Sequence, residues 1–394
     1  MVSKKATKRR RGDDDAAEST AEFAKPVFLV GALWAEQPAY SVFMVDAAAA
    51  AAEGNGLPSA RTLAELPGAE HGMSFVAAHS QHGTWIVGVG GLGGSTIIYD
   101  PSTPGTTLRA PELYPKQEPI LISHGGKVYA ISRRPRVHLN LNLDFPPWFE
   151  SLSFRKGVPC IYHDGCPSWK WLPPPPCFPC FLDPCEYRHP PDISVSSYAV
   201  VDSHILISLQ QEETGTYAFH VVKKTWEKVC DKNLPFVGQA VPLGGSLFAA
   251  CRVTPNNASA AAASVFHMSI KASTPVVPSK LTACLIQEFP VAVEGEIPRL
   301  LFCPLGRGSF CSIRLGSCQQ SRKAKYLKHL QIVLTAFQMD NIDAILTACQ
   351  TESATAKDLY GALQVKQENQ IYKFKGKSRF VASLHMPVVA ALSM

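Results

Sequence analysis

The sequence has no long apolar run and no secretory leader pattern. Its uninterrupted hydrophobic stretches fall well short of the roughly 20 residues that a membrane-spanning helix needs, so no membrane segment is predicted. The start at Met1 lacks an apolar core region and is followed by acidic residues, which argues against secretory and organellar targeting. We therefore expect a soluble nuclear or cytoplasmic protein whose 12 cysteines are reduced thiols.

Catalytic motifs are also missing. No Gly-x-Ser-x-Gly elbow occurs, and the sequence places no Ser/His/Asp set together. The stretch from Gly88 to Gly93 matches the dinucleotide fingerprint G-x-G-x-x-G, which works only where a helix begins directly after it. The next residues are instead the β-branched run Ser95–Tyr99 and then Pro101, so a turn between strands is expected. We predict no enzyme activity and no cofactor.

Excess positive charge is confined to the N-terminus. The net charge is +6, and six basic residues lie between Lys4 and Arg11, so the remaining chain sums to 6 − 6 = 0. A neutral body argues against nucleic-acid binding, because phosphate contacts need clustered Lys and Arg. Residues 1–24 are predicted to be a disordered tail, in which the basic run is either a nuclear-localisation signal or only solubilising. The candidate signal residues are Lys8, Arg9, Arg10 and Arg11.

Short strands and glycine turns are abundant. From Phe75 to Thr103 the chain reads strand, turn, strand, glycine-rich turn, strand. Similar hairpins begin near residues 75, 119, 197, 237 and 299. This repetition predicts an all-β fold, a β-propeller of about six four-stranded blades within a range of about five to seven.

The propeller is expected to occupy residues 25–340, with 341–394 as a C-terminal extension. The N-terminal strands make an incomplete blade, which a C-terminal strand would complete to close the ring. The candidates for that strand are Leu330–Phe337 and Ile371–Phe374. Residues 340–363 have weak helical spacing.

Several motifs resemble the kelch and galactose-oxidase-like propeller superfamily, and in particular uncharacterised plant proteins of that kind. They are the double glycines, Tyr99-Asp100-Pro101, the spacing from Phe219-His220 to Trp226, Trp85 to Gly91, Pro147 to Glu150, and Trp171 to Pro176. The resemblance implies protein–protein interaction more often than catalysis. A propeller enzyme of the galactose-oxidase or sugar-processing type, with a metal site, is the alternative function.

A Cys/His-rich region adjoins these motifs. Cys177 and Cys180 have half of a zinc-site spacing, and Cys185 could add a ligand. No second Cys-x-x-Cys exists, and prolines interrupt the run, so a proline-stiffened loop with incidental thiols is the preferred interpretation.

Two long insertions, 133–147 and 173–191, are expected to project from one face of the propeller, with the Gly-Gly turns on the opposite face. Long loops on a rigid scaffold commonly bind partners, although these two could simply be variable. We therefore predict a monomeric module that binds a protein through this face, while Trp148, Trp169 and Trp171 pack within blades. The candidate partner-binding residues are Arg133, Arg134, Arg136, His138, Phe178, Phe181 and Tyr187.

Overall fold

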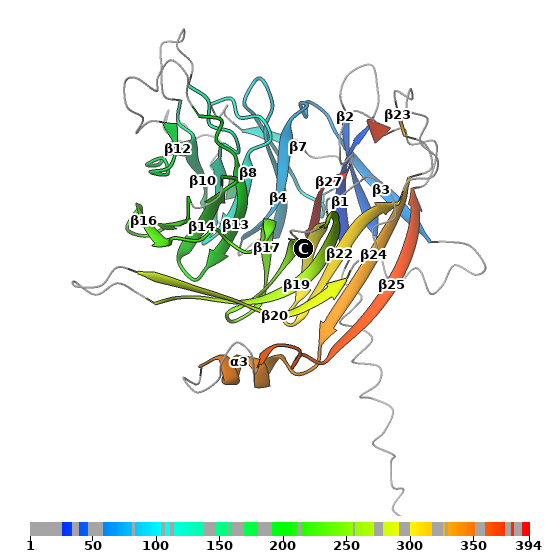
Figure 1. Cartoon of the computed structure of the whole chain (residues 1–394). Coiled ribbons are helices and arrows are strands. Elements are labelled where there is room, and N and C mark those ends of the chain that lie inside the picture. Colours follow the sequence, from blue (N-terminus) through cyan, green and yellow to red (C-terminus); the bar gives the residue numbers. More distant parts are fainter. Residues whose placement is uncertain are drawn as a thin grey trace, which may run out of the picture.

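The computed structural model describes residues 26–33, 39–45, 58–80, 83–103, 107–110, 114–137, 146–155, 158–159, 169–179, 191–211, 214–254, 257–271, 279–290, 300–316, 326–327, 330–350, 359–374, 380–381 and 388–394. Over these residues the fold is mostly β, with one short helix, α3 (Ile342–Gln350) (Figure 1). No helix in this part of the chain has the length and apolar character needed to cross a membrane.

The strands pair into antiparallel units, which we name A to F. Unit A contains, in order of pairing, β27 (Val388–Ser393), β1 (Val27–Leu33), β2 (Ala39–Val45) and β3 (Ser59–Leu66). Unit B contains β4 (Met73–Ser80), β5 (Gly83–Gly90), β6 (Ser95–Tyr99) and β7 (Thr107–Ala110). Unit C contains β8 (Ile120–His124), β9 (Lys127–Ile131), β10 (Phe149–Arg155) and β12 (Trp169–Trp171), with β11 (Val158–Pro159) paired to β10.

The second half of the chain continues the pattern. Unit D contains β13 (Val195–Val201), β14 (His204–Leu209), β15 (Thr216–His220) and β16 (Thr225–Cys230). Unit E contains β17 (Val237–Gly244), β18 (Leu247–Thr254), β19 (Asn257–Lys271) and β20 (Lys280–Pro290). Unit F contains β21 (Leu301–Gly306), β22 (Ser309–Gly316), β24 (Gln331–Met339) and β25 (Val365–Phe374). The short strands β23 (Tyr326–Leu327) and β26 (Phe380–Val381) pair with each other, and β26 also pairs with β1.

The units form a closed ring. Buried apolar clusters fill the spaces between A and B, B and C, C and D, D and E, and E and F, and a further cluster lies between F and A. The first strands β27, β4 and β8 contact one another in turn, as do β13, β17 and β21, and β21 contacts β27. Parallel pairing also joins β13 to β17 and β25 to β3. This is the arrangement of a β-propeller.

Strand β1 shows why the sequence folds this way. It is a continuous apolar run, as expected for a strand buried on both faces. Because side chains alternate along a strand, Val27 and Leu29 face unit F while Phe28 and Val30 face unit B. Both faces of β1 are therefore buried between neighbouring units.

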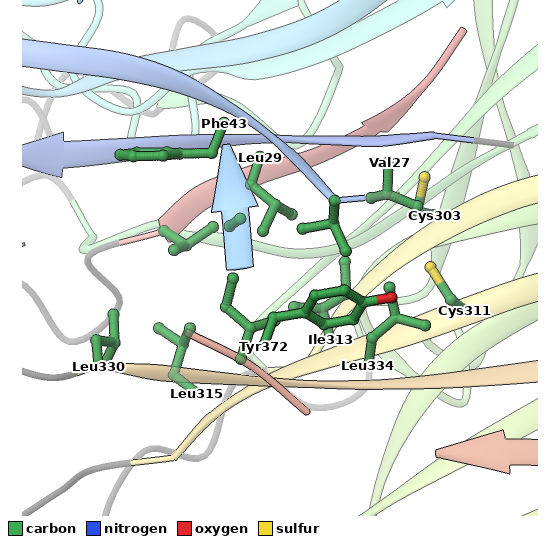
Figure 2. Packing of buried hydrophobic residues seen from close by; sticks show 14 of the residues in the cluster. Val27, Leu29, Phe43, Cys303, Cys311, Ile313, Leu315, Leu330, Leu334 and Tyr372 are labelled. Carbon is green, nitrogen blue, oxygen red and sulfur yellow. The ribbon is translucent and has the colours of Figure 1, made fainter. Parts of the chain in front are cut away.

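A C-terminal strand lies beside β1, but it is β27, not either predicted candidate (Figure 1). Leu330–Phe337 lies in β24, which pairs with β22 and β25, and Ile371–Phe374 lies in β25. Neither candidate is free to pair with β1, because β24 lies between β22 and β25, and β25 lies between β24 and β3. Figure 2 shows the F/A cluster that results, with the Tyr372 ring among apolar side chains from units A and F.

The hairpin turns form at their glycines. Gly125 and Gly126, between β8 and β9, have φ values of 57° and 69°, a backbone conformation that glycine adopts without steric cost. Helix α3 lies within the stretch of predicted helical spacing. Its Leu346 covers the turn at Gly245, where an added Cβ would lie 2.7 Å from a leucine methyl carbon.

Candidate partner-binding surface

One end of the ring carries the described residues from which the two predicted insertions start. We call this end the loop face and define it in unit C by Ile131, Phe149 and Trp171, where the chain leaves β9, enters β10 and leaves β12. These residues are neighbours because Phe149 is the register partner of Ile131 and its carbonyl accepts the Leu172 N–H at 2.9 Å. Helix α3 and the Gly125–Gly126 turn lie at the opposite end of their units.

The roots of the two insertions are fixed to each other. The Arg133 carbonyl accepts the Val195 N–H at 2.9 Å, which ties the first insertion to the start of unit D. The Trp226 Nε1–H of unit D donates to the Pro173 carbonyl at 2.8 Å, at the start of the second. Trp148 and Phe178 meet edge-to-face with ring centroids 6.0 Å apart. Both insertions therefore begin from segments that are held by unit D.

Arg133 contributes to this attachment. Its Nε donates to the Glu118 carbonyl at 3.1 Å. Its guanidinium also lies beside Tyr198, where burial raises the pKa of the phenol and Arg133 opposes that rise. Arg133 thus connects the segment before unit C to unit D, while its contact with a partner stays a prediction.

Arg134 and Arg136 are exposed on the loop face, and Pro135 between them is buried. Among the described residues, no ion pair involves either guanidinium. These two arginines are the predicted contact residues that the structure leaves available.

The structure contradicts the prediction that Phe178 is a partner-binding residue. Its side chain is only 2% exposed and packs in the C/D cluster. An aromatic ring so close to the base of the second insertion contributes more by burial than it would by facing solvent. Phe178 therefore belongs to the scaffold.

Trp171 is the opposite case. Trp148 and Trp169 are buried as predicted, but Trp171, the last residue of β12, is 68% exposed. Leu92, in the turn after β5, is 84% exposed. The sequence does not indicate that either side chain is exposed, since apolar residues in or next to a strand are typical of a core.

Below these side chains lies a buried ion pair that the sequence did not reveal. Lys116 Nζ donates to Glu150 Oε2, and the two side chains are 1% and 2% exposed. Burial lowers the pKa of Lys116 and raises the pKa of Glu150, and each partner opposes the shift of the other. Glu150 is the register partner of Trp171, and Lys116 bridges to Gly91 beside Leu92. The pair therefore underlies the exposed apolar residues of units B and C.

The glycine turns divide between the faces. Gly125–Gly126 and Gly244–Gly245 lie opposite the loop face, as predicted. Gly90 and Gly91 do not, because they join the second and third strands of unit B and Gly91 bridges to Lys116. Their motif continues into strand β6, so the predicted turn between strands is confirmed.

The remaining predicted residues mostly lie outside the described part. This holds for His138, Phe181, Tyr187, Cys180, Cys185 and the Lys8–Arg11 run. Cys177 is half-buried near the C/D cluster. Within the described ranges, no group of three or more His, Cys, Asp or Glu side chains is arranged to hold a metal ion.

A family model described as "Protein of unknown function (DUF1668)" matches residues 24–368. The chain belongs to the DUF1668 family. The matched part runs from before β1 into β25, so strand β27 lies beyond it. No curated protein matches the chain.

Among solved structures, the β-propeller domain of Myceliophteria thermophila Cps50 (Swd1) is 9% identical, covering 88% of this chain and 85% of that chain, with a TM-score of 0.37. YjhT is 12% identical, covering 66% of this chain and 97% of that one, with a TM-score of 0.27. Kluyveromyces lactis Hsv2 is 8% identical, covering 87% and 98%, with a TM-score of 0.28. The propeller arrangement of this DUF1668 protein is established by its own strand pairing and packing.

Proposed function

We propose that this DUF1668 protein is a six-bladed, kelch-like β-propeller, with units A to F as its blades, that acts as a non-catalytic protein–protein interaction module. The cyclic series of clusters supports this proposal, because the F/A cluster returns the last unit to the first. Such a ring holds its loops in fixed positions, and binding residues are commonly carried on loops of rigid scaffolds.

The main support for the proposal is the set of side chains exposed on the loop face. It presents exposed Arg134, Arg136, Trp171 and Leu92 around insertions whose roots are locked together. Arginine and tryptophan are the residue types that most often dominate binding energy at protein interfaces. The partner is a protein, and the propeller itself acts as a monomer.

Affinity capture from an extract of the source organism tests this proposal. The tagged full chain is compared with Trp171→Asp on the loop face and with Val222→Asp, a 76% exposed residue in the turn after β15 on the opposite face. We expect Trp171→Asp to deplete specific co-purifying proteins and Val222→Asp to retain them. If Trp171→Asp retained the co-purifying proteins and Val222→Asp lost them, the binding surface would lie on the face opposite the loop face, and the proposal would be wrong.

We propose a nuclear and cytoplasmic location, supported by the basic run from Lys8 to Arg11. A fluorescent fusion in which these four residues are alanine should lose nuclear accumulation relative to the wild type. Unchanged nuclear signal would assign the run to solubility alone.

A further inference from the structure

We propose that the loop face binds an acidic, carboxylate-rich peptide segment of a partner protein, with Arg134 and Arg136 recognising its charges and Trp171 anchoring an apolar side chain. This inference rests on the proposed function and adds the chemistry of the partner.

The basic pair is pre-positioned. Arg133 is held by the Glu118 carbonyl and the Val195 N–H, and Pro135 is buried, so the backbone that carries Arg134 and Arg136 is fixed at two points. Ordering a flexible loop on binding costs free energy, and a fixed backbone avoids part of that cost.

Among the described residues, no ion pair involves the guanidinium group of Arg134 or Arg136, and two carboxylates of units B and C are engaged elsewhere. Glu150 is committed to Lys116. Glu70 accepts the Gly93 N–H at 2.8 Å and the Ser95 hydroxyl, which fixes the turn between β5 and β6. A ligand that brings its own carboxylates therefore complements the exposed guanidinium groups.

Guanidinium chemistry selects the kind of ligand. Arginine offers parallel N–H donors that match a carboxylate bidentately. A nucleic acid would present phosphates along an extended backbone and would need many basic residues, whereas the body of this chain is neutral overall. A short acidic peptide segment therefore fits two arginines better than a nucleic acid does.

An apolar anchor lies at the same end of unit C. Trp171 is the last residue of β12 and the arginines come after β9, and these strands flank the start of β10. Leu92 extends the apolar surface from unit B. An acidic segment with interspersed aliphatic residues would use both parts of this surface.

Fluorescence anisotropy of the full-length protein tests the inference. The probes are a labelled glutamate-rich peptide with interspersed leucine, the same peptide with glutamine replacing glutamate, and a labelled single-stranded oligonucleotide. We expect binding of the glutamate peptide only, weakened about tenfold or more by Arg134→Glu with Arg136→Glu. Trp171→Ala should also weaken it.

The matched control is Lys271→Glu with Lys280→Glu. These two exposed lysines are register partners on the β19–β20 hairpin at the opposite face, and the charge change is the same. Equal weakening by the control, equal binding of the glutamine peptide, preference for the oligonucleotide, or no binding would overturn the inference. The capture experiment with Trp171→Asp is independent of these peptides, so partners lost there while the glutamate peptide fails would retain the proposed function alone.

Discussion

The interfaces F/A and B/C are built from different chemistry. The F/A cluster is apolar and includes a group of three aromatic rings, with the centroid of Phe374 4.8 Å from that of Phe43 and 4.5 Å from that of Phe380. The B/C interface instead adds the buried Lys116–Glu150 pair to its aliphatic cluster.

The difference matches what each interface must do. F/A joins segments from the two ends of the chain, and apolar burial is non-directional, so it supplies cohesion there. B/C lies below part of the loop face, where the positions of the link and of β10 matter. A buried ion pair adds little net stability but is costly to break, so it favours one arrangement.

The largest expected effect comes from removing β27. Deleting residues 388–394 strips Val388 and Leu392 from the clusters beside β1, worth together about 3–6 kcal/mol by burial alone. It also leaves the β1 edge unpaired. Because domains are stable by about 5–15 kcal/mol, we expect largely unfolded or aggregated protein by circular dichroism and size-exclusion chromatography.

Deletion of residues 1–24 is the control for that experiment. These residues precede β1, so the thermal unfolding midpoint should stay close to that of the full chain. A folded, monomeric protein without 388–394 would show that the F/A interface does not need its closing strand.

The second prediction concerns Lys116→Met. This change leaves the Glu150 carboxylate buried without its ammonium partner, which costs about 3–5 kcal/mol. Urea denaturation followed by tryptophan fluorescence would measure the loss.

The double variant Lys116→Met with Glu150→Leu sharpens this test. Replacing both charges with apolar side chains is often neutral or stabilising, so most of the lost stability should return. If the ion pair positions the loop face, the double variant should regain stability but bind the glutamate peptide more weakly. Equal destabilisation by the single and double variants would argue against an unpaired charge as the cause.

The same contrast explains what could be predicted from the sequence. Local signals worked: β-branched runs predicted the hairpins, and paired glycines predicted the turns at Gly125–Gly126 and Gly244–Gly245. These signals depend on residues close together in the chain, where backbone preferences act directly.

Contacts between residues far apart in the sequence could not be predicted. Lys116 and Glu150 are 34 residues apart, and neither stands in a motif that points to the other. The predicted closing strands each contain an aromatic residue that favours strands, whereas β27 has none, includes two alanines and pairs with β1. Of the predicted contact residues, Arg134 and Arg136 are exposed, whereas Phe178 is buried in the C/D cluster and Trp171, predicted to pack within a blade, is exposed, because burial depends on contacts between distant segments.

The third prediction concerns a neutral hydrogen bond in B/C. The Trp169 Nε1–H donates to the buried Thr96 hydroxyl at 3.1 Å. Trp169→Phe removes the indole N–H and leaves the buried Thr96 hydroxyl without this hydrogen bond. We therefore expect the free energy of unfolding, measured by urea denaturation, to fall by about 1–2 kcal/mol. Trp85→Phe is the matched control, because Trp85 packs against the same cluster but its indole N–H has no hydrogen-bond partner among the described residues. A larger cost for Trp85→Phe would show that ring volume, not the hydrogen bond, decides.

The smallest expected effect concerns His204 in unit D, a polar residue that, unlike Lys116, has no closely matched partner. Burial lowers the pKa of His204, and His220, whose ring centroid is 4.7 Å away, lowers it further. Lys223 acts in the same direction, whereas Glu227 and Asp202 oppose it. The neutral imidazole is therefore the form that the folded protein favours.

The downward shift of the His204 pKa determines how stability depends on pH. Because the folded pKa lies below the ordinary value of about 6.5, the unfolded chain binds more protons below that pH. The stabilisation from neutral His204 is complete above about pH 6.5 and is lost as the pH falls through the window down to the folded pKa. His79, His124 and His267 also have lowered pKa values through burial, so the wild-type decline has several contributions. His204→Asn should make the urea midpoint fall less between pH 7.5 and pH 5.5 than it does in the wild type, and an unchanged slope would show that His204 titrates alike in both states.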